Sequence, residues 1–151
     1  MIQLDYELSE PEAEIASELA DAEQLELHYY HFRGNLTLKI NQLDLSARWG
    51  WVPILDAAVA FAAIVDALAT SGALEEFEFT ESTDRIRFQR DDDVVRVSAS
   101  YIQGETAIDH AELQVASSQF RTRVLNDLVA RFPELRTNPY FAELTAVEFD
   151  H

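Results

Sequence analysis

The chain has no cysteine, and this absence excludes three kinds of chemistry at once. Without thiols there is no disulfide framework, no thiolate metal site and no cysteine nucleophile. Glycine is also scarce, with four residues in 151, and the sequence has no glycine-rich loop that could hold a phosphate group. The serine-nucleophile motifs Gly-x-Ser-x-Gly and Ser-x-x-Lys are absent as well. We therefore expect a protein that is not an enzyme and that uses no cofactor or metal.

Basic residues are in short supply. Lysine occurs once, at Lys39, and 11 basic residues face 28 acidic ones, which gives a net charge of −17. Residues 1–32 contain nine acidic residues and no lysine or arginine, so about half of the net charge lies in the first fifth of the chain. Such a surface repels nucleic-acid phosphates and anionic lipids and attracts basic proteins. We expect a basic protein partner, and neither nucleic acid nor membrane.

The sequence also lacks the marks of export or membrane insertion. The first residues have no basic segment followed by an apolar one, so no secretory signal is expected. The most apolar stretch, residues 49–69, includes Asp56 and Asp66. A carboxylate in the centre of a bilayer costs roughly 2.5–3.5 kcal/mol on insertion scales. We interpret the stretch as a buried helix of a soluble protein, and we expect a cytoplasmic location, which the missing cysteines fit.

Alternating apolar and polar residues predict several strands. The first is residues 2–8, followed by a Ser-x-x-Glu capping box and a surface helix to about residue 23. One meander then follows over residues 25–33, 36–40 and 43–49, with turns at Gly34–Asn35 and Asn41–Gln42. A second meander follows over residues 76–79, 85–88 and 95–101, and residues 104–108 form a loop or a short strand.

Helical spacing of apolar residues indicates two long helices. The first covers about residues 53–71, begins at Pro53 and should be the central core helix. The second is amphipathic and covers about residues 115–132, ending at Pro133. Asn138 and Pro139 then open a short terminal helix. The fold class is therefore α+β, in a single domain over residues 1–151: two antiparallel meanders of about six strands, in one sheet or two, packed against these helices.

Three local clusters resemble metal or catalytic sites but have simpler explanations. His28 and His31 lie three residues apart in a predicted strand, so they point to opposite faces and cannot chelate one metal ion. Residues 109–112 offer His110 as a general base, but Asp109 and Glu112 match a helix capping box equally well. The acidic run 91–93 lacks the alternation and the glycine of a calcium-binding loop. We interpret it as a solvated hairpin turn.

Trp49, Gly50 and Trp51 form a further candidate site. On a strand both indoles face the same side, where they could cap the core beneath the helix that starts at Pro53. They could instead line a ligand pocket or a partner-binding hot spot together with Tyr29 and Tyr101. Packing in the core is the favoured interpretation.

The acidic segment 1–32 has two evenly matched interpretations: a binding surface for a basic partner, or a solvated face under compositional selection. On the first interpretation, the protein is a non-catalytic binding module that neutralises or chaperones its partner, as an immunity protein or antitoxin does. The expected contact residues are Glu10, Glu12, Glu14, Glu18, Asp21 and Glu23. The alternatives are a small-molecule binder or enzyme with a pocket near Trp49 and Trp51, and a structural homodimer whose acidity is salt adaptation.

Overall fold

The computed structural model describes residues 1–9, 32–70, 74–79 and 82–149 of the chain. Its fold is α+β, as the sequence predicts, with eight strands in two antiparallel four-stranded sheets instead of about six. The first sheet contains β1 (Ile2–Leu8), β2 (Arg33–Ile40), β3 (Leu43–Asp44) and β4 (Ala47–Pro53). In this sheet β2 is central, because it pairs with each of the other three strands. The predicted helix before residue 23 and the strand 25–33, except its last two residues, lie outside the described part.

Strand β1 pairs with β2 along its whole length, from Ile2 opposite Ile40 to Leu8 opposite Gly34. The alternation in the sequence sets the two faces: Leu4, Leu36 and Leu38 are buried, whereas Asp5 and Lys39 are exposed. One face of the sheet therefore belongs to the core and the other faces solvent, which is typical of an antiparallel sheet.

The turn expected at Gly34–Asn35 is wrong, because both residues lie inside β2. Glycine is required at position 34 for a different reason. A Cβ atom there would lie 2.0 Å from the carbonyl oxygen of Glu7 on β1. The residue marks a close approach between two strands, one of the meanings that glycine has within a sheet. The other predicted turn, Asn41–Gln42, is confirmed between β2 and β3.

Helix α2 (Ile54–Thr70) is the central helix that the sequence predicts. Its buried side chains recur at helical spacing: Ile54, Leu55, Ala57, Ala58, Phe61, Val65 and Leu68. Pro53 is the last residue of β4 and not the first of the helix, so the strand passes directly into the helix. The amide of Ile54, which has no partner within the helix, donates a hydrogen bond of 3.0 Å to the carbonyl of Phe32.

The second sheet is a meander in chain order: β5 (Leu74–Glu78), β6 (Arg85–Asp91), β7 (Val94–Ala99) and β8 (Glu105–Asp109). Glutamate faces arginine across its outer face, since Glu76 lies opposite Arg87 and Glu78 opposite Arg85, and Glu76 forms ion pairs with both arginines. Residues 104–108, left open between loop and strand, mostly belong to β8. The hairpin turn at the acidic run is also confirmed, with Asp92 at a φ of 56°.

Helix α3 (His110–Arg131) starts five residues before the predicted 115. The buried stripe of α3 begins at His110. Because its members His110 and Ser117 are polar, the spacing of apolar residues alone does not show this part of the stripe. The capping box predicted at Asp109 and Glu112 is wrong, since the Asp109 side chain makes no capping hydrogen bond. The 3₁₀ helix η2 (Pro133–Thr137) and α4 (Pro139–Phe149) follow. At α4 the predicted cap is confirmed: Asn138 Oδ1 accepts a 3.0 Å bond from the amide of Phe141.

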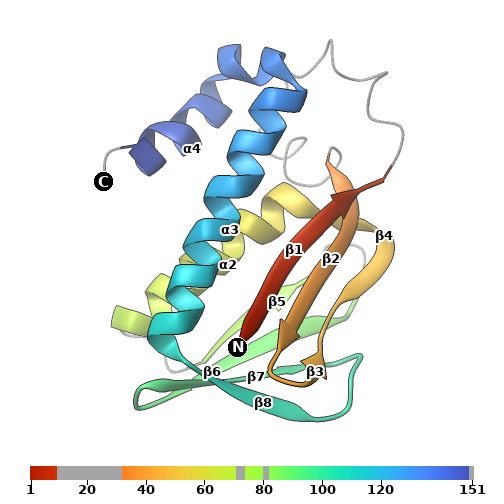
Figure 1. The fold of residues 1–151 in the computed structure, drawn as a ribbon, viewed down its shortest axis with the longest axis vertical. Helices are drawn as coiled ribbons and strands as arrows, with labels where there is room; N and C mark the ends of the chain where they lie inside the picture. The colour runs from red at the N-terminus through yellow and green to blue at the C-terminus, as the bar shows by residue number, and fades with distance from the viewer. Residues whose placement is uncertain (10–31, 71–73, 80–81, 150–151) are drawn as a thin grey trace.

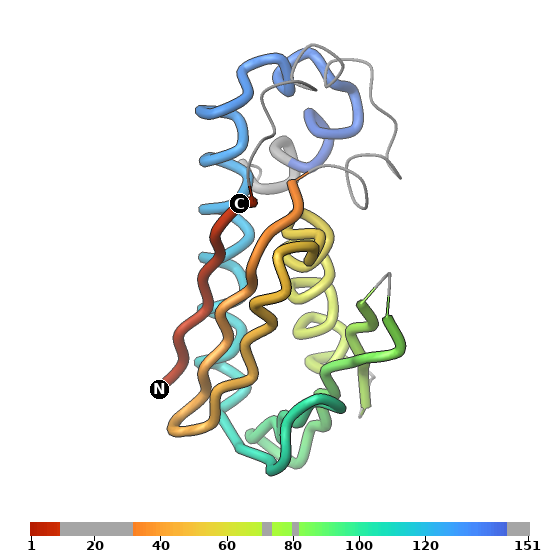
Figure 2. The backbone as a smooth tube through the Cα atoms, turned by 90° about the vertical axis from the view of Figure 1, so that its right-hand side faces the viewer, coloured from red at the N-terminus to blue at the C-terminus, as the bar shows by residue number. Residues whose placement is uncertain are grey.

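Figures 1 and 2 show how these elements are arranged. Helix α2 lies behind the first sheet and α3 stands beside β1, so that the two helices pack on the buried face of the sheet, and the second sheet lies across their lower end. The core fills the space between these layers. None of the described helices is long and apolar enough to cross a membrane.

Candidate functional site

The acidic residues are the first candidate for function, and the six expected contact residues between Glu10 and Glu23 lie outside the described part. Of the nine acids in residues 1–32, Asp5 and Glu7 on β1 are described. Asp5 lies 3.5 Å from Arg123 of α3, and Glu7 accepts a 3.4 Å hydrogen bond from Asn35. The predicted contact surface is therefore neither confirmed nor contradicted.

The arginines are largely occupied by contacts within the protein. Five of them form ion pairs with carboxylates of the described residues: Arg48, Arg85, Arg87, Arg96 and Arg123. Arg90 instead donates hydrogen bonds to the carbonyls of Leu68 and Asp92. These contacts distribute the paired arginines over both sheets and α3.

Many carboxylates, in contrast to the arginines, have no partner among the described residues. Nine described acidic side chains have no hydrogen bond or ion pair within the described part of the protein: Asp66, Glu75, Glu78, Asp92, Asp93, Glu105, Asp109, Glu134 and Glu143. They belong to α2, η2, α4, the second sheet and its hairpin turn. The excess of negative charge therefore extends beyond the first 32 residues and over much of the surface, where opposite charges within the protein do not neutralise it.

The two tryptophans lie in an aromatic cluster between the sheets. The rings of Trp49 and Trp51 stack with centroids 5.1 Å apart, and Trp49 also contacts Phe79 at 5.0 Å and Tyr101 at 4.9 Å. Gly50 makes this stacking possible because it adopts a φ of 80°, which favours glycine. Both indoles are half-buried against the core, which supports the interpretation as core packing. Tyr29, the fourth residue of the expected pocket, lies outside the described residues.

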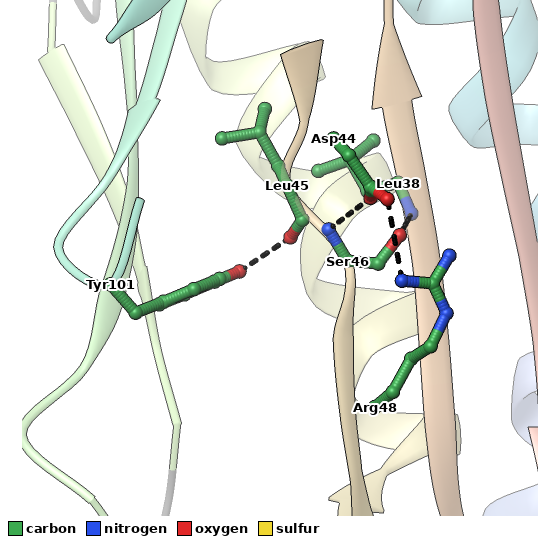
Figure 3. Close-up of polar contacts among 6 residues, drawn as sticks. All are labelled: Leu38, Asp44, Leu45, Ser46, Arg48 and Tyr101. Atoms are coloured by element: carbon green, nitrogen blue, oxygen red, sulfur yellow. Dashed lines mark hydrogen bonds and ion pairs between the residues drawn. The ribbon is translucent and has the colours of Figure 1, made fainter. Parts of the chain in front are cut away.

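Tyr101 joins the two sheets through its hydroxyl, which donates a 2.7 Å hydrogen bond to the carbonyl of Leu45 (Figure 3). Burial, followed by the nearby carboxylates Asp84 and Asp44, raises the pKa of Tyr101 well above its usual range. Asp44 itself accepts hydrogen bonds from Ser46 and Arg48, which hold its pKa below the usual value. These contacts fix the turn between β3 and β4 and do not form a catalytic arrangement.

His110, the candidate general base, has a structural position. Its side chain is buried at the start of α3, and Nε2 lies 3.0 Å from the carbonyl of Val65 in α2. Glu112 lies 3.2 Å from the terminal amino group of Met1. The contact between His110 and the carbonyl of Val65 links α3 to α2. His28 and His31 lie outside the described part, and the described residues contain no cluster of three metal-ligating side chains.

A polar contact set that the sequence does not suggest joins β1 to α3. The Tyr6 hydroxyl donates a 2.7 Å hydrogen bond to Asp127, and burial together with this bond raises the pKa of Tyr6 well above its usual range. Arg123 donates to the carbonyl of Leu4 and also pairs with Asp5. Tyr6 and Asp127 are 121 residues apart, so no local pattern could have shown that these groups meet.

Two shallow hollows lie beside this contact set. One of about 250 Å³ opens between β1 and α3, with Gln3, Asp5, Gln119 and Arg123 among its lining residues. The other, of about 400 Å³, runs along α3 past Gln119, Arg123 and Asp127. The two hollows share Gln119 and Arg123, so the Arg123 side chain lies where they meet.

No family model, curated protein or solved structure matches this chain. The chemistry of its surface must therefore carry any functional assignment.

Proposed function

We propose that the protein is a non-catalytic binding module that neutralises or chaperones a basic protein partner, in the manner of an immunity protein or antitoxin. The observation that carries the proposal is the net charge of −17, with nine acids and no lysine or arginine in residues 1–32. Charge of one sign steers an oppositely charged partner and raises the association rate. A cytoplasmic location belongs to the same proposal, as does the absence of nucleic acid among the partners.

The distribution of ion pairs supports this proposal. If the protein's own arginines neutralised its carboxylates, the charge would have no external target. Six arginines are instead held in contacts with a few carboxylates and carbonyls, and nine described acidic side chains have no partner among the described residues. The acidic surface therefore remains available for a cationic protein.

Charge reversal tests the proposal. The triple variant Glu10→Lys, Glu14→Lys and Glu18→Lys changes the expected contact segment. The matched control changes three partnerless acids elsewhere: Asp66→Lys, Glu105→Lys and Glu143→Lys. Each substitution adds two charges, so each triple raises the net charge by six, from −17 to −11.

Binding to two basic proteins, a pancreatic-type ribonuclease and cytochrome c, is measured by surface plasmon resonance at 50 and 300 mM salt. We expect the first triple to slow association about tenfold and to weaken its salt dependence, since clustered charges dominate steering. The control triple should change association less than threefold. Equal effects of the two triples would contradict a contact surface in residues 10–23. Absence of salt-dependent binding by the wild-type protein would contradict the proposed function itself.

A further inference from the structure

The outer edge of β1 is a place where a strand could be added to the first sheet. Antiparallel pairing points the backbone groups of alternate residues to opposite sides of a strand. The carbonyl of Met1 accepts a hydrogen bond from Asn41, and the amide of Ser9 donates to Arg33, so the odd-numbered residues point to β2. The backbone groups of Ile2, Leu4, Tyr6 and Leu8 therefore point away from β2. No other described strand pairs with them.

Side chains close the middle of this edge. The outward carbonyl of Leu4 accepts a hydrogen bond from Arg123, and the outward amide of Tyr6 donates a 2.8 Å bond to the carboxylate of its neighbour Asp5. Asp5 and Arg123 also lie 3.5 Å apart, so the two closing groups form one ion pair. Both side chains are about half-exposed, 55% for Asp5 and 45% for Arg123, and exposed ion pairs contribute little stability. The side chains of Asp5 and Arg123 can therefore be displaced from the edge at a small cost in free energy.

We infer that the outer edge of β1 is a docking site for an extended basic segment of the partner. In the free protein, Arg123 occupies the position beside Asp5 that a basic side chain of the partner takes in the complex. This inference rests on the proposed function and names the site and conformation of the partner. On docking, Arg123 leaves the Leu4 carbonyl, which the partner's backbone amide then binds. Asp5 is released to pair with a lysine or arginine of the added strand. The mode is strand addition, in which main-chain hydrogen bonds give affinity and alternate side chains give specificity.

Charge decides which occupant fits. The solvent face of β1 presents Gln3, Asp5 and Glu7, and Asp127 lies beside Tyr6 on α3. A second copy of β1 in antiparallel register would bring Asp5 against the partner's Asp5, and like charges directly opposite are destabilising. A strand with lysine or arginine on its solvent face and apolar residues toward α3 is complementary instead. The hollow between β1 and α3 lies directly beside this edge, next to Arg123.

The probe is an acetylated and amidated peptide of eight residues that alternates lysine and valine. Its length is sufficient to pair with all seven residues of β1. A second peptide carries N-methyl groups on alternate amides, so it keeps the charge but cannot complete the ladder. The variant Arg123→Ala opens the edge. The control Arg96→Ala removes an arginine of similar exposure, 52%, from an ion pair on β7, so the net charge changes equally. Circular dichroism spectra and thermal midpoints check that both variants fold.

In fluorescence anisotropy at 50 mM salt, we expect Arg123→Ala to bind the unmethylated peptide about fivefold more tightly than Arg96→Ala. This is the equivalent of one hydrogen bond of about 1 kcal/mol that no longer competes. N-methylation should weaken binding at least tenfold, and peptide binding should slow hydrogen exchange at the Leu4 and Leu8 amides.

Equal affinities for the two peptides, or equal effects of the two variants, would overturn strand docking. Salt-dependent binding of the ribonuclease would then still leave the proposed function in place. If neither peptide binds at 50 mM salt, the edge is not the docking site, and the charge-reversal experiment decides separately whether the protein binds basic partners.

Discussion

Replacement of Gly34 by alanine tests whether β1 and β2 pair as closely as described. The added Cβ would lie 2.0 Å from the carbonyl oxygen of Glu7 and 2.9 Å from Leu8 Cα. Both atoms belong to the backbone, so no side-chain rotation can relieve the clash. Because an ordinary contact needs about 3.4 Å or more, the two strands must separate by more than 1 Å at this point.

The cost can be worked from the contacts that this separation breaks. Overpacking of a well-packed site costs about 1–3 kcal/mol. Separation also weakens two backbone hydrogen bonds near Gly34, one of them the 2.9 Å bond from Ser9 to Arg33, at about 1 kcal/mol each. We expect Gly34→Ala to lower the free energy of unfolding by roughly 3–5 kcal/mol. That is a large part of the 5–15 kcal/mol that typical domains have.

Urea denaturation followed by circular dichroism measures this change, and hydrogen exchange locates it. The matched control is Gly104→Ala, where the nearest side-chain atom lies at 3.6 Å and the strain comes from a φ of 105° alone. That control should cost about 1–2 kcal/mol. If Gly34→Ala changed stability by less than 1 kcal/mol and left the Ser9 amide protected, the close pairing of β1 and β2 would be wrong.

Two further predictions concern the buried polar contacts. The pKa values of Tyr6 and Tyr101 are raised from the ordinary 10.0, so their contribution to stability is complete below pH 10 and is lost as the pH rises through the higher folded-state values. The free energy of unfolding should decline above pH 10 by at most about 1.4 kcal/mol per pH unit for each tyrosine, and less for partly exposed Tyr6. Tyr101→Phe should flatten this decline, and an unchanged slope would refute the assigned cause. Asn138→Ala should cost about 1–2 kcal/mol, since it removes the buried cap of α4, whereas Thr137→Ala, at an exposed neighbour, should cost less than half of that. Equal thermal midpoints of these two variants would show that the cap contributes nothing.

Local patterns in the sequence predicted the types of the elements well. Alternation located β1 and the second meander, and helical spacing located α2, because the side chains of a strand or a helix repeat with a fixed period. The cap at Asn138 was also readable, since the bond from its side chain spans only three residues. The charge of the first 32 residues follows from the sequence alone and needs no fold.

Tertiary structure decided the features that depend on neighbours distant in the chain. Gly34 suggested a turn, because nothing nearby in the sequence shows that Glu7 approaches it. The start of α3 was placed too late, because the buried His110 finds its partner in Val65, 45 residues away. The edge closure by Asp5 and Arg123 joins groups that are 118 positions apart, by the difference of their numbers. Periodicity fixes which way a side chain points, but only the packed chain fixes what it meets.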